Sequence, residues 1–433
     1  SRRQRQMCIR DRNKIEASVY GLVRKYPLVK KTIKILYQGF FDLLSRKKDL
    51  FSGYYSYKEG FFFGFHDISP FSEDETMILA HKLPFDLCMP RTGDKMEIGY
   101  IDFKEDELGD FYKVTETTAW NYHKGCRLQW LDNKHIIYNT EKGGKLVSEI
   151  TSLSTGESRC INHPIDSIYN SATESLATSF CYERLNRCMP GYGYSILNGD
   201  IVEAYPKDDG LFLIDLNSGE KKMLVSLYEL AMNVGSNYLE DYSHFVTHTE
   251  FSKDGNYISF LYRCAPIGGE GKDLHKTFII VYDLQRATYI VLPTQESGSH
   301  YVWNYKNEII ASCILDGKNC HVLYNVNTPN DYKIIAGKVL NSDGHQTFIS
   351  DDVFITDTYP DKYRMTKLYK VNICDNVVEL IASIYSPKQF QTRDVFKHIA
   401  CDLHPRVSPQ GKYVSFDSAT TGKRSLFVMT LDK

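Results

Sequence analysis

The stretch HPRVSPQGKYVSFDS, His404 to Ser418, places a histidine ahead of a polar turn and an alternating strand. HTEFSKDGNYISFLYR, His248 to Arg263, follows the same plan, and so does HDISPFSEDETMILAHK, His66 to Lys82. Four further copies begin at Leu128, Ile168, His300 and His345. Seven copies, about 40 to 80 residues apart, are typical of the blades of a β-propeller.

The segments between the copies supply the remaining strands. GLFLIDLNSGEKKMLV from Gly210, TFIIVYDLQRATYIVL from Thr277 and CHVLYNVNTPNDYKII from Cys320 each have a strand, turn, strand pattern. The last copy, with RSLFVMTL after it, supplies only about three strands. We therefore predict an all-β fold, a seven-bladed β-propeller over residues 51–433. A strand near Tyr54–Tyr57 would complete the last blade, and this closure removes exposed sheet edges.

The first fifty residues have a different character. Residues 13–50 carry apolar side chains at three- and four-residue steps with lysines and arginines between them, which predicts a short amphipathic helical extension interrupted at Pro27. It would pack on the propeller or on a partner subunit in a homo-oligomer, with a membrane surface as the alternative. Residues 1–12, SRRQRQMCIRDR, resemble a translated sequencing adapter or a disordered end, and the fold prediction leaves them out.

Composition restricts the class of partner. A net charge of −2 argues against nucleic-acid binding through bulk charge. No apolar run approaches the roughly 18 residues that a membrane span needs. The eleven cysteines form no CxxC pair, which predicts reduced thiols in a cytoplasmic protein. Export stays open because residues 1–12 obscure the natural start.

Histidines open several of the copies. In a propeller the innermost strands begin near one mouth of the central channel, so the side chains at these positions should meet there. They are His66 with Asp67, Gln129, Asn170, His248, His300, His345, and Asp402 with His404. Gathered imidazoles suit metal ligation and proton transfer, although they also brace blades through hydrogen bonds. GxSxG, P-loop, HExxH and GxGxxG motifs are missing from the sequence.

Several phrases resemble a known family. HPRVSPQGKYVSFDSATTGKRSLFVM, THTEFSKDGNYISF and ESGSHYVW are similar to phrases of the oligogalacturonate lyases, cytoplasmic seven-bladed propellers. The chain is more similar, over nearly all of residues 51–433, to uncharacterised propellers associated with polysaccharide gene clusters. These share phrases of the type GCRLQW, PGYGY, DTYPD and CDLHPR. The resemblance implies a polysaccharide lyase that acts on uronic-acid-containing glycans.

The resemblance also implies site roles. His248 matches the histidine that is the base in the lyases, and a divalent metal, typically manganese, is held there by histidines and a glutamine. His300 and His404 match two of these ligands, whereas Asp402 replaces a third histidine. A carboxylate suits a hard divalent ion. The glutamine falls near Ile399, beside His398, so we take His345 as its replacement.

The chemistry implied is β-elimination. Removal of the C5 proton of a uronate builds negative charge on its carboxylate, which a metal or an arginine would neutralise. Besides His248, the candidate catalytic residues are Arg406, Arg187 and Tyr192, and Arg406 lies two residues beyond His404 on one strand face. Candidate substrate-binding residues are His66, Arg127, Gln129, Arg263 and Tyr359. Each arginine could instead form an interblade ion pair or a surface charge.

Two other classes of function remain open. The propeller could bind glycans or assemble proteins without catalysis. It could also be a glycoside hydrolase, because Asp67, Asp357 and Asp402 supply carboxylates from different blades. The expected partner in the enzymatic readings is an acidic oligo- or polysaccharide.

Overall fold

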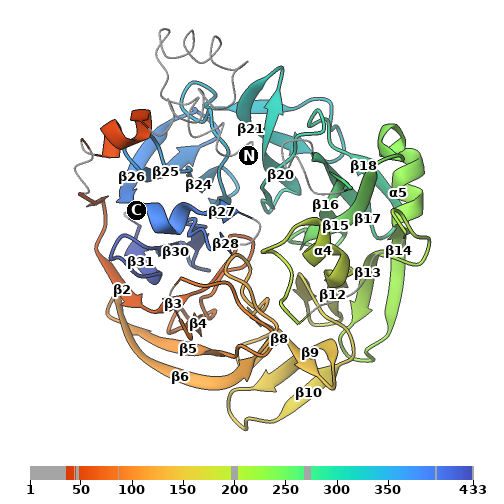
Figure 1. The fold of residues 1–433 in the computed structure, drawn as a ribbon, viewed down its shortest axis with the longest axis horizontal. Coiled ribbons are helices and arrows are strands. Elements are labelled where there is room, and N and C mark those ends of the chain that lie inside the picture. The colour runs from red at the N-terminus through yellow and green to blue at the C-terminus, as the bar shows by residue number, and fades with distance from the viewer. Residues whose placement is uncertain are drawn as a thin grey trace.

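Seven antiparallel sheets stand around a central axis in the computed structural model (Figure 1). The structure describes residues 36–42, 44, 48–85, 87–196, 203–267, 275–394 and 397–431. The prediction of a seven-bladed β-propeller is confirmed. Residues 36–42 are helical, whereas the rest of the predicted extension up to residue 35 lies outside the described residues.

The first four blades each contain four consecutive strands. Blade 1 contains β3 (Phe61–Phe62), β4 (Met77–Lys82), β5 (Met96–Lys104) and β6 (Glu107–Thr117). Blade 2 contains β7 (Gln129–Trp130), β8 (His135–Lys142), β9 (Lys145–Ser152) and β10 (Ser158–Ile161). Blade 3 contains β11 (Ile168–Asn170), β12 (Ser175–Ser179), β13 (Gly210–Asp215) and β14 (Lys221–Ser226). Blade 4 contains β15 (Tyr242–Phe251), β16 (Tyr257–Pro266), β17 (Lys276–Asp283) and β18 (Thr288–Val291).

Two further blades follow, and the N-terminal side of the chain adds a strand to the second. Blade 5 contains β19 (Tyr301–Trp303), β20 (Glu308–Leu315), β21 (Lys318–Asn325) and β22 (Lys333–Ile335). Blade 6 contains β23 (Gln346–Ser350), β24 (Val353–Asp357), β25 (Met365–Asn372) and β26 (Val378–Tyr385). The short strand β1 (Leu50–Phe51) pairs with the outer strand β26 and gives blade 6 a fifth strand, which the sequence analysis had not predicted.

Blade 7 combines the two ends of the propeller. It contains β29 (Arg406–Val407), β30 (Tyr413–Ser418) and β31 (Ser425–Thr430) from the C-terminal side. The fourth strand is β2 (Tyr55–Glu59), which pairs antiparallel with β31 so that Ser56 lies opposite Val428. The ring is therefore closed by backbone hydrogen bonds between the first and last parts of the fold.

The repeated phrase forms a serine-capped turn between the first two strands of a blade. In blades 1, 4 and 7 the serine hydroxyl accepts a hydrogen bond from the backbone N–H of the residue five positions later, at 3.0–3.1 Å. The pairs of acceptor and donor are Ser72 and Met77, Ser252 and Tyr257, and Ser408 and Tyr413. Gly255 and Gly411 sit in these turns at positive φ, where a side chain would be strained. The local chemistry of the phrase thus defines each hairpin.

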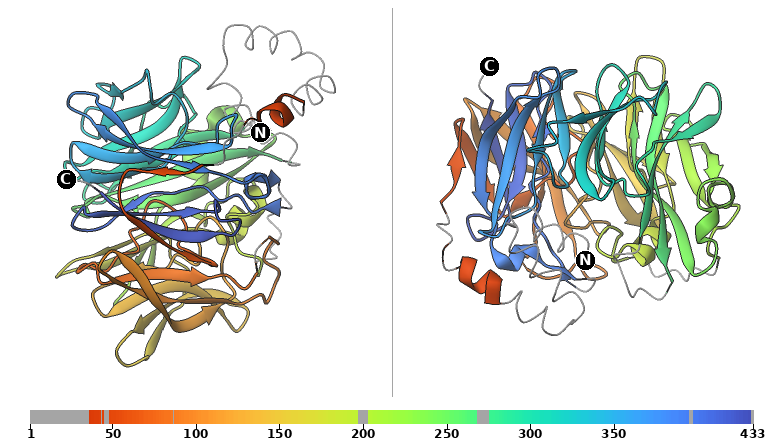
Figure 2. Two further views of the ribbon diagram at one scale, coloured as in Figure 1. Left: turned by 90° about the vertical axis from the view of Figure 1, so that its left-hand side faces the viewer. Right: turned by 90° about the horizontal axis from the view of Figure 1, so that it is seen from above.

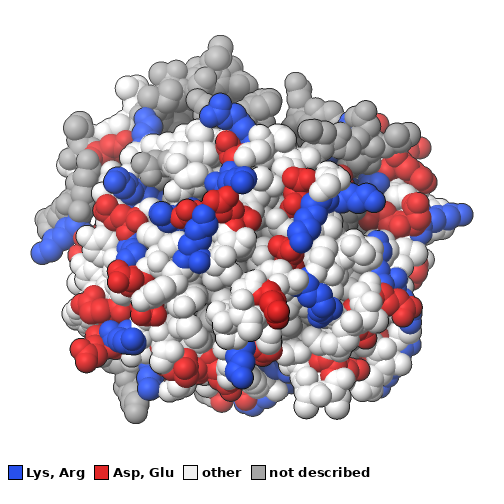
Figure 3. Space-filling view, turned by 90° about the horizontal axis from the view of Figure 1, so that it is seen from below, with Lys and Arg blue, Asp and Glu red and all other residues white. Residues whose placement is uncertain are grey.

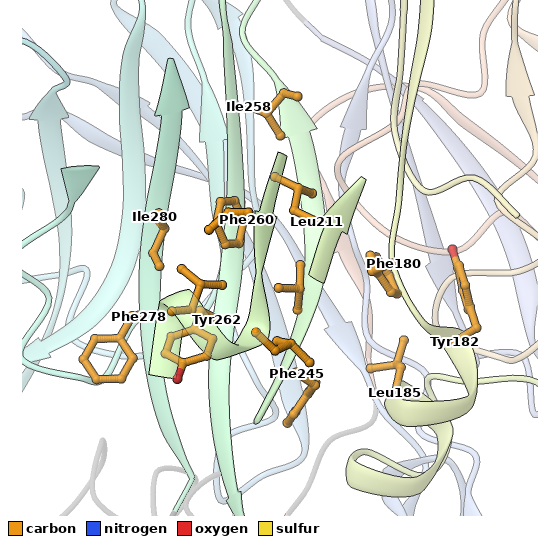
Figure 4. Close-up of a cluster of buried hydrophobic side chains, with 14 of the residues drawn as sticks. Phe180, Tyr182, Leu185, Leu211, Phe245, Ile258, Phe260, Tyr262, Phe278 and Ile280 are labelled. Atoms are coloured by element: carbon orange, nitrogen blue, oxygen red, sulfur yellow. The ribbon is translucent and has the colours of Figure 1, made fainter. Parts of the chain in front are cut away.

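Apolar side chains fill the space between blades. Figure 4 shows such a cluster, in which Phe245, Phe260 and Tyr262 of blade 4 pack near Leu211 of blade 3 and Leu185. Leu185 belongs to α4 (Tyr182–Cys188), a helix inserted between β12 and β13. A second helix, α5 (Leu227–Asn233), and the 3-10 turn Ser236–Tyr238 follow β14. α4 lies on one face of the ring (Figure 2), whereas α5 lies at its outer rim (Figure 1).

A second insertion lies between blades 6 and 7. It contains the 3-10 turn Lys388–Gln391 and the hairpin of β27 (Arg393–Asp394) with β28 (Lys397–His398). The hairpin lies near the axis of the ring in Figure 1, on the same side as α4 in Figure 2. α4 and this hairpin therefore lie on the same face of the ring, at one mouth of the channel.

The outer surface carries mixed charge. Lysines and arginines are interspersed with acidic side chains over the face in Figure 3.

The helix at residues 36–42 contacts blade 6 through Asp42, whose carboxylate accepts from Arg364 Nε at 2.6 Å and from Nη2 at 2.9 Å. No helix among the described residues is both long and apolar enough to cross a membrane.

Candidate active site in the central channel

Five histidines from five blades surround the ring of Phe65. The ring centroids lie 4.5 Å apart for His66, 4.9 Å for His248, 5.0 Å for His404 and 5.9 Å for both His300 and His345. All five imidazoles are buried, with at most 6% of each residue exposed. The structure thus brings together the five histidines that open copies of the repeat. Phe65, the residue they share, carried no signal in the sequence beyond its place before His66.

Backbone carbonyls orient two of these rings. Nδ1 of His66 donates to the carbonyl of Gln346 at 2.8 Å, and Nδ1 of His404 donates to that of Gly64 at 2.9 Å. Because a carbonyl only accepts, each ring carries its proton on Nδ1 and presents the lone pair of Nε2. This arrangement is the one that metal-ligating histidines adopt.

Side-chain oxygens orient the other three rings. Nδ1 of His345 lies 2.9 Å from both carboxylate oxygens of Asp357, and Nδ1 of His300 lies 3.0 Å from Asp343 Oδ1. Nδ1 of His248 lies 2.9 Å from the hydroxyl of Thr247. In each of the five histidines, Nδ1 therefore contacts an oxygen of the surrounding protein.

Burial keeps three of the five imidazoles neutral. It lowers the pKa of His66 to about 3, and it lowers the pKa of His248 and of His404 well below the usual value. The nearby cation Lys124 lowers the pKa of His248 further. Neutral imidazole is the form that binds a metal or accepts a proton.

Three of the predicted metal ligands form a compact group. One ligand atom each from His345, Asp402 and His404 lies within 4.8 Å of the other two, and all three residues are buried. His300 is outside this group of three, although its ring centroid is 4.0 Å from that of His345. Two imidazole nitrogens and a carboxylate, with both rings held from behind by oxygens, form a donor set that fits a divalent cation.

Two channel histidines have a strained backbone. His248 and His404 adopt positive φ angles of 54° and 47°, a region that non-glycine residues enter at a cost. In β15 this conformation coincides with a shift of register between Thr247 and Glu250. Such strain persists only where neighbouring groups impose it.

Three predicted site residues are held by the scaffold. Arg406 is fully buried and contacts the carboxylate of Asp417, the hydroxyl of Ser415 and the carbonyl of Gly64. Arg127 forms a two-pronged ion pair with Asp67 and also contacts Asp166. Gln129 donates to the carbonyls of Arg127 and Asp166. These contacts give the three side chains interblade roles.

The remaining candidates lie nearer the channel or at its mouth. The centroid of Tyr192 is 5.7 Å from that of His248, and Tyr359 is 5.7 Å from His345. Arg263 is half-buried, donates to the sulfur of Met189 and helps to lower the pKa of His248. Arg187 lies in the last turn of α4 and is exposed.

A pair of histidines that the sequence did not predict lies at the mouth of the channel. Nε2 of His123 and Nδ1 of His398 are in contact, and the ring of Tyr192 stacks on His123 with centroids 4.6 Å apart. Gly191 has φ of +94°, and a Cβ there would lie 2.7 Å from Cβ of His398. The phrase PGYGY therefore packs tightly over the channel. His398 had one signal, its place beside the position of the family's glutamine.

The comparisons with known proteins give a fold. A solved oligogalacturonate lyase in complex with manganese is similar over 89% of this chain and 98% of its own, with a TM-score of 0.58 and 13% identity. The oligogalacturonate lyase of Vibrio parahaemolyticus is similar over the same shares, with a TM-score of 0.57 and 12% identity. No protein-family model and no curated protein matches the chain. The predicted resemblance to oligogalacturonate lyases is thus confirmed as a shared seven-bladed propeller fold.

Proposed function

We propose that the protein is a lyase that cleaves uronate-containing oligosaccharides by β-elimination, with His248 as the base. The observation that supports this most is the set of buried imidazoles around Phe65, beside a compact group of ligands for a divalent cation. A proton acceptor and a site for negative charge are the two components that elimination next to a carboxylate requires.

His248 has the properties of the base in this reaction. Its low pKa keeps the ring unprotonated at neutral pH, and its Nδ1 contact with Thr247 leaves Nε2 to accept the C5 proton. The electrons of the C5–H bond then move into the C5–carboxylate system. The bond from C4 to the leaving oxygen breaks as the double bond between C4 and C5 forms. Tyr192, whose ring lies beside that of His248, would protonate that oxygen.

His345, Asp402 and His404 would hold the divalent cation, for which manganese remains our prediction. When bound, the cation would neutralise the charge that develops on the uronate carboxylate. Arg263, on the strand after His248, would contribute a second positive charge at this end of the substrate. The predicted roles of Arg406, Arg127 and Gln129 in contacting substrate are less well supported, because their polar groups already bind other groups of the protein.

The hydrolase alternative has little support. It needs two carboxylates that face one sugar, one of them ready to donate a proton. Asp67 is bound on both oxygens by Arg127, and Asp357 is bound on both oxygens by His345. Both carboxylates are thus engaged by neighbouring side chains.

The test is an elimination assay. The protein with added Mn²⁺ is incubated with a panel of acidic oligo- and polysaccharides, and the unsaturated uronate product is followed by its ultraviolet absorbance. We expect activity on at least one substrate, loss of at least 100-fold in His248→Ala, and retention in His135→Ala, an exposed histidine paired with Asp132. Absence of elimination across the panel, or full activity in His248→Ala, would refute the proposal.

A further inference from the structure

A buried carboxylate, Asp166, lies behind the strand that carries His248. It sits between β10 and β11 and is completely buried. Its Oδ1 contacts Lys124 Nζ at 2.8 Å and Arg127 Nε at 3.0 Å. Its Oδ2 accepts both the backbone N–H of Thr249, at 2.8 Å, and the hydroxyl of the same residue, at 2.9 Å. One carboxylate thus joins two cations of blade 2 to the innermost strand of blade 4.

The bond from the N–H of Thr249 to Asp166 involves the peptide group that joins His248 to Thr249. The N–H of this peptide donates to Asp166, and its carbonyl, which belongs to His248, accepts from the hydroxyl of Tyr301. Both polar groups of one peptide plane are therefore fixed from opposite sides. This is the point at which His248 adopts its left-handed conformation and β15 loses its regular pairing with β16.

The charge on Asp166 is secured by the two cations. Burial alone would raise the pKa of this carboxyl, but Arg127 and Lys124 lower it to about 2. Arg127 is in turn bound by Asp67, which follows His66 in the chain. A charged acceptor makes a stronger hydrogen bond than a neutral one, so the ionised carboxylate is well suited to hold a strained peptide.

We propose that Asp166 is a positioning residue for His248. Its carboxylate, held by Lys124 and Arg127, fixes the Thr249 amide and hydroxyl, and thereby holds His248 in the backbone conformation that directs Nε2 into the channel. This proposal rests on the proposed function only in naming His248 as the base. The geometry of His248 that it describes is measurable without turnover.

The hydroxyl of Thr249 offers the cleanest test, because valine has the same shape and removes one of the two bonds to Asp166. We expect Thr249→Val to lower kcat by about 10-fold, the size of one charge-assisted hydrogen bond, with little change in KM. Thr249→Ser, which keeps the hydroxyl, should recover kcat to within about 2-fold of the original protein. Asp166→Asn, which also weakens the amide bond, should lower kcat further.

Two matched controls separate positioning from general damage. Thr366→Val removes a buried hydroxyl that donates to the carbonyl of Ile384 in blade 6, far along the chain from His248, and should leave kcat unchanged. Thr178→Val removes the other contact of the Thr249 hydroxyl while leaving its bond to Asp166, and should also have little effect. Unchanged kcat in both Thr249→Val and folded Asp166→Asn would overturn the proposal. It would also be overturned if Thr366→Val and Thr178→Val lowered kcat as much as Thr249→Val does.

A readout without substrate keeps this test separate from the lyase assay. In protein labelled with ¹⁵N-histidine, the ring signals of His248 are assigned by their loss in His248→Gln. We expect Thr249→Val to move these signals and Thr366→Val to leave them in place. If Thr249→Val moves the ring signals of His248 but the protein has no elimination activity, the positioning role would be supported and the proposed lyase function refuted. Signals that stay in place in Thr249→Val and Asp166→Asn would refute the positioning role whatever the activity.

Discussion

Asp357 Oδ2 accepts the backbone N–H of His404 at 3.1 Å, across the junction between blades 6 and 7. The same carboxylate contacts Nδ1 of His345, so a single side chain orients two of the three residues that would hold a metal. Burial raises the pKa of Asp357 to about 7, with Asp402 nearby acting in the same direction. Its position behind two ligands makes it a supporting residue of the candidate metal site.

We therefore predict that Asp357→Asn weakens divalent metal binding. Loss of such a supporting carboxylate typically costs about 10- to 100-fold in metal affinity. Titration calorimetry of the original and variant proteins with Mn²⁺ measures the change. Asp352→Asn, which removes an exposed partner of Lys306 on the same blade, is the control and should leave affinity unchanged. Equal affinities in all three proteins would contradict the assignment.

Arg406 should matter for stability. It is fully buried against Asp417, and Asp417 also accepts the backbone N–H groups of Phe63 and Gly64. Arg406→Met leaves that carboxylate buried without its cation, which typically costs about 3–5 kcal/mol of unfolding free energy. Urea unfolding measures the loss, and Arg286→Met, which breaks an exposed pair, should cost less than about 1 kcal/mol. Similar values for the two variants would show that Arg406 does not brace the ring.

Glu250 predicts a pH dependence of stability. Burial raises its pKa from 4.5 to about 8, and its Oε2 has no hydrogen-bond partner within the described part of the chain. The folded protein therefore keeps a proton that the unfolded chain releases, and this contribution to stability is lost as pH rises from 4.5 to 8. Relative to Glu250→Gln, the original protein should lose up to about 1.4 kcal/mol per pH unit in this window. Urea unfolding of both proteins at several pH values measures the difference, and a constant difference would disprove the shift.

Gly191 should not tolerate a side chain. Gly191→Ala combines a positive φ with a contact of 2.7 Å to Cβ of His398. Gly143→Ala shares the positive φ in an open turn with nothing within 4 Å, so it isolates the conformational cost of about 1–2 kcal/mol. We expect Gly191→Ala to lose at least about 1 kcal/mol more than Gly143→Ala in thermal or urea unfolding. An equal loss of unfolding free energy in the two variants would mean that the PGYGY segment can shift to accommodate a Cβ at residue 191.

Local chemistry explains how much of the fold the sequence predicts. The serine at the head of each turn, the glycine at positive φ and the alternating strand all lie within one short phrase, so Ser252, Gly255 and Tyr257 identify a hairpin without reference to the rest of the chain. The channel histidines were predictable for the same reason, because each opens such a phrase. β1 was missed because two residues carry no periodic pattern.

The arginines show where prediction from sequence fails. Arg127 looked suited to a uronate, but its guanidinium contacts Asp67, 60 residues away in the chain. His123 and His398 are 275 residues apart, and only the folded ring makes them neighbours. Which side chains face the channel depends on such long-range contacts, and these contacts cannot be predicted from a single sequence.

The pairing of β2 with β31 has a consequence for the order of assembly. The carbonyl of Tyr54 accepts from the hydroxyl of Thr430, across 376 residues of chain, so blade 7 is completed only after residue 430 has been synthesised. The same event brings His404 to Gly64, since one belongs to the last blade and the other precedes His66 in the first. A chain that ends before blade 7 would therefore lack both the closed ring and the His404 side of the channel.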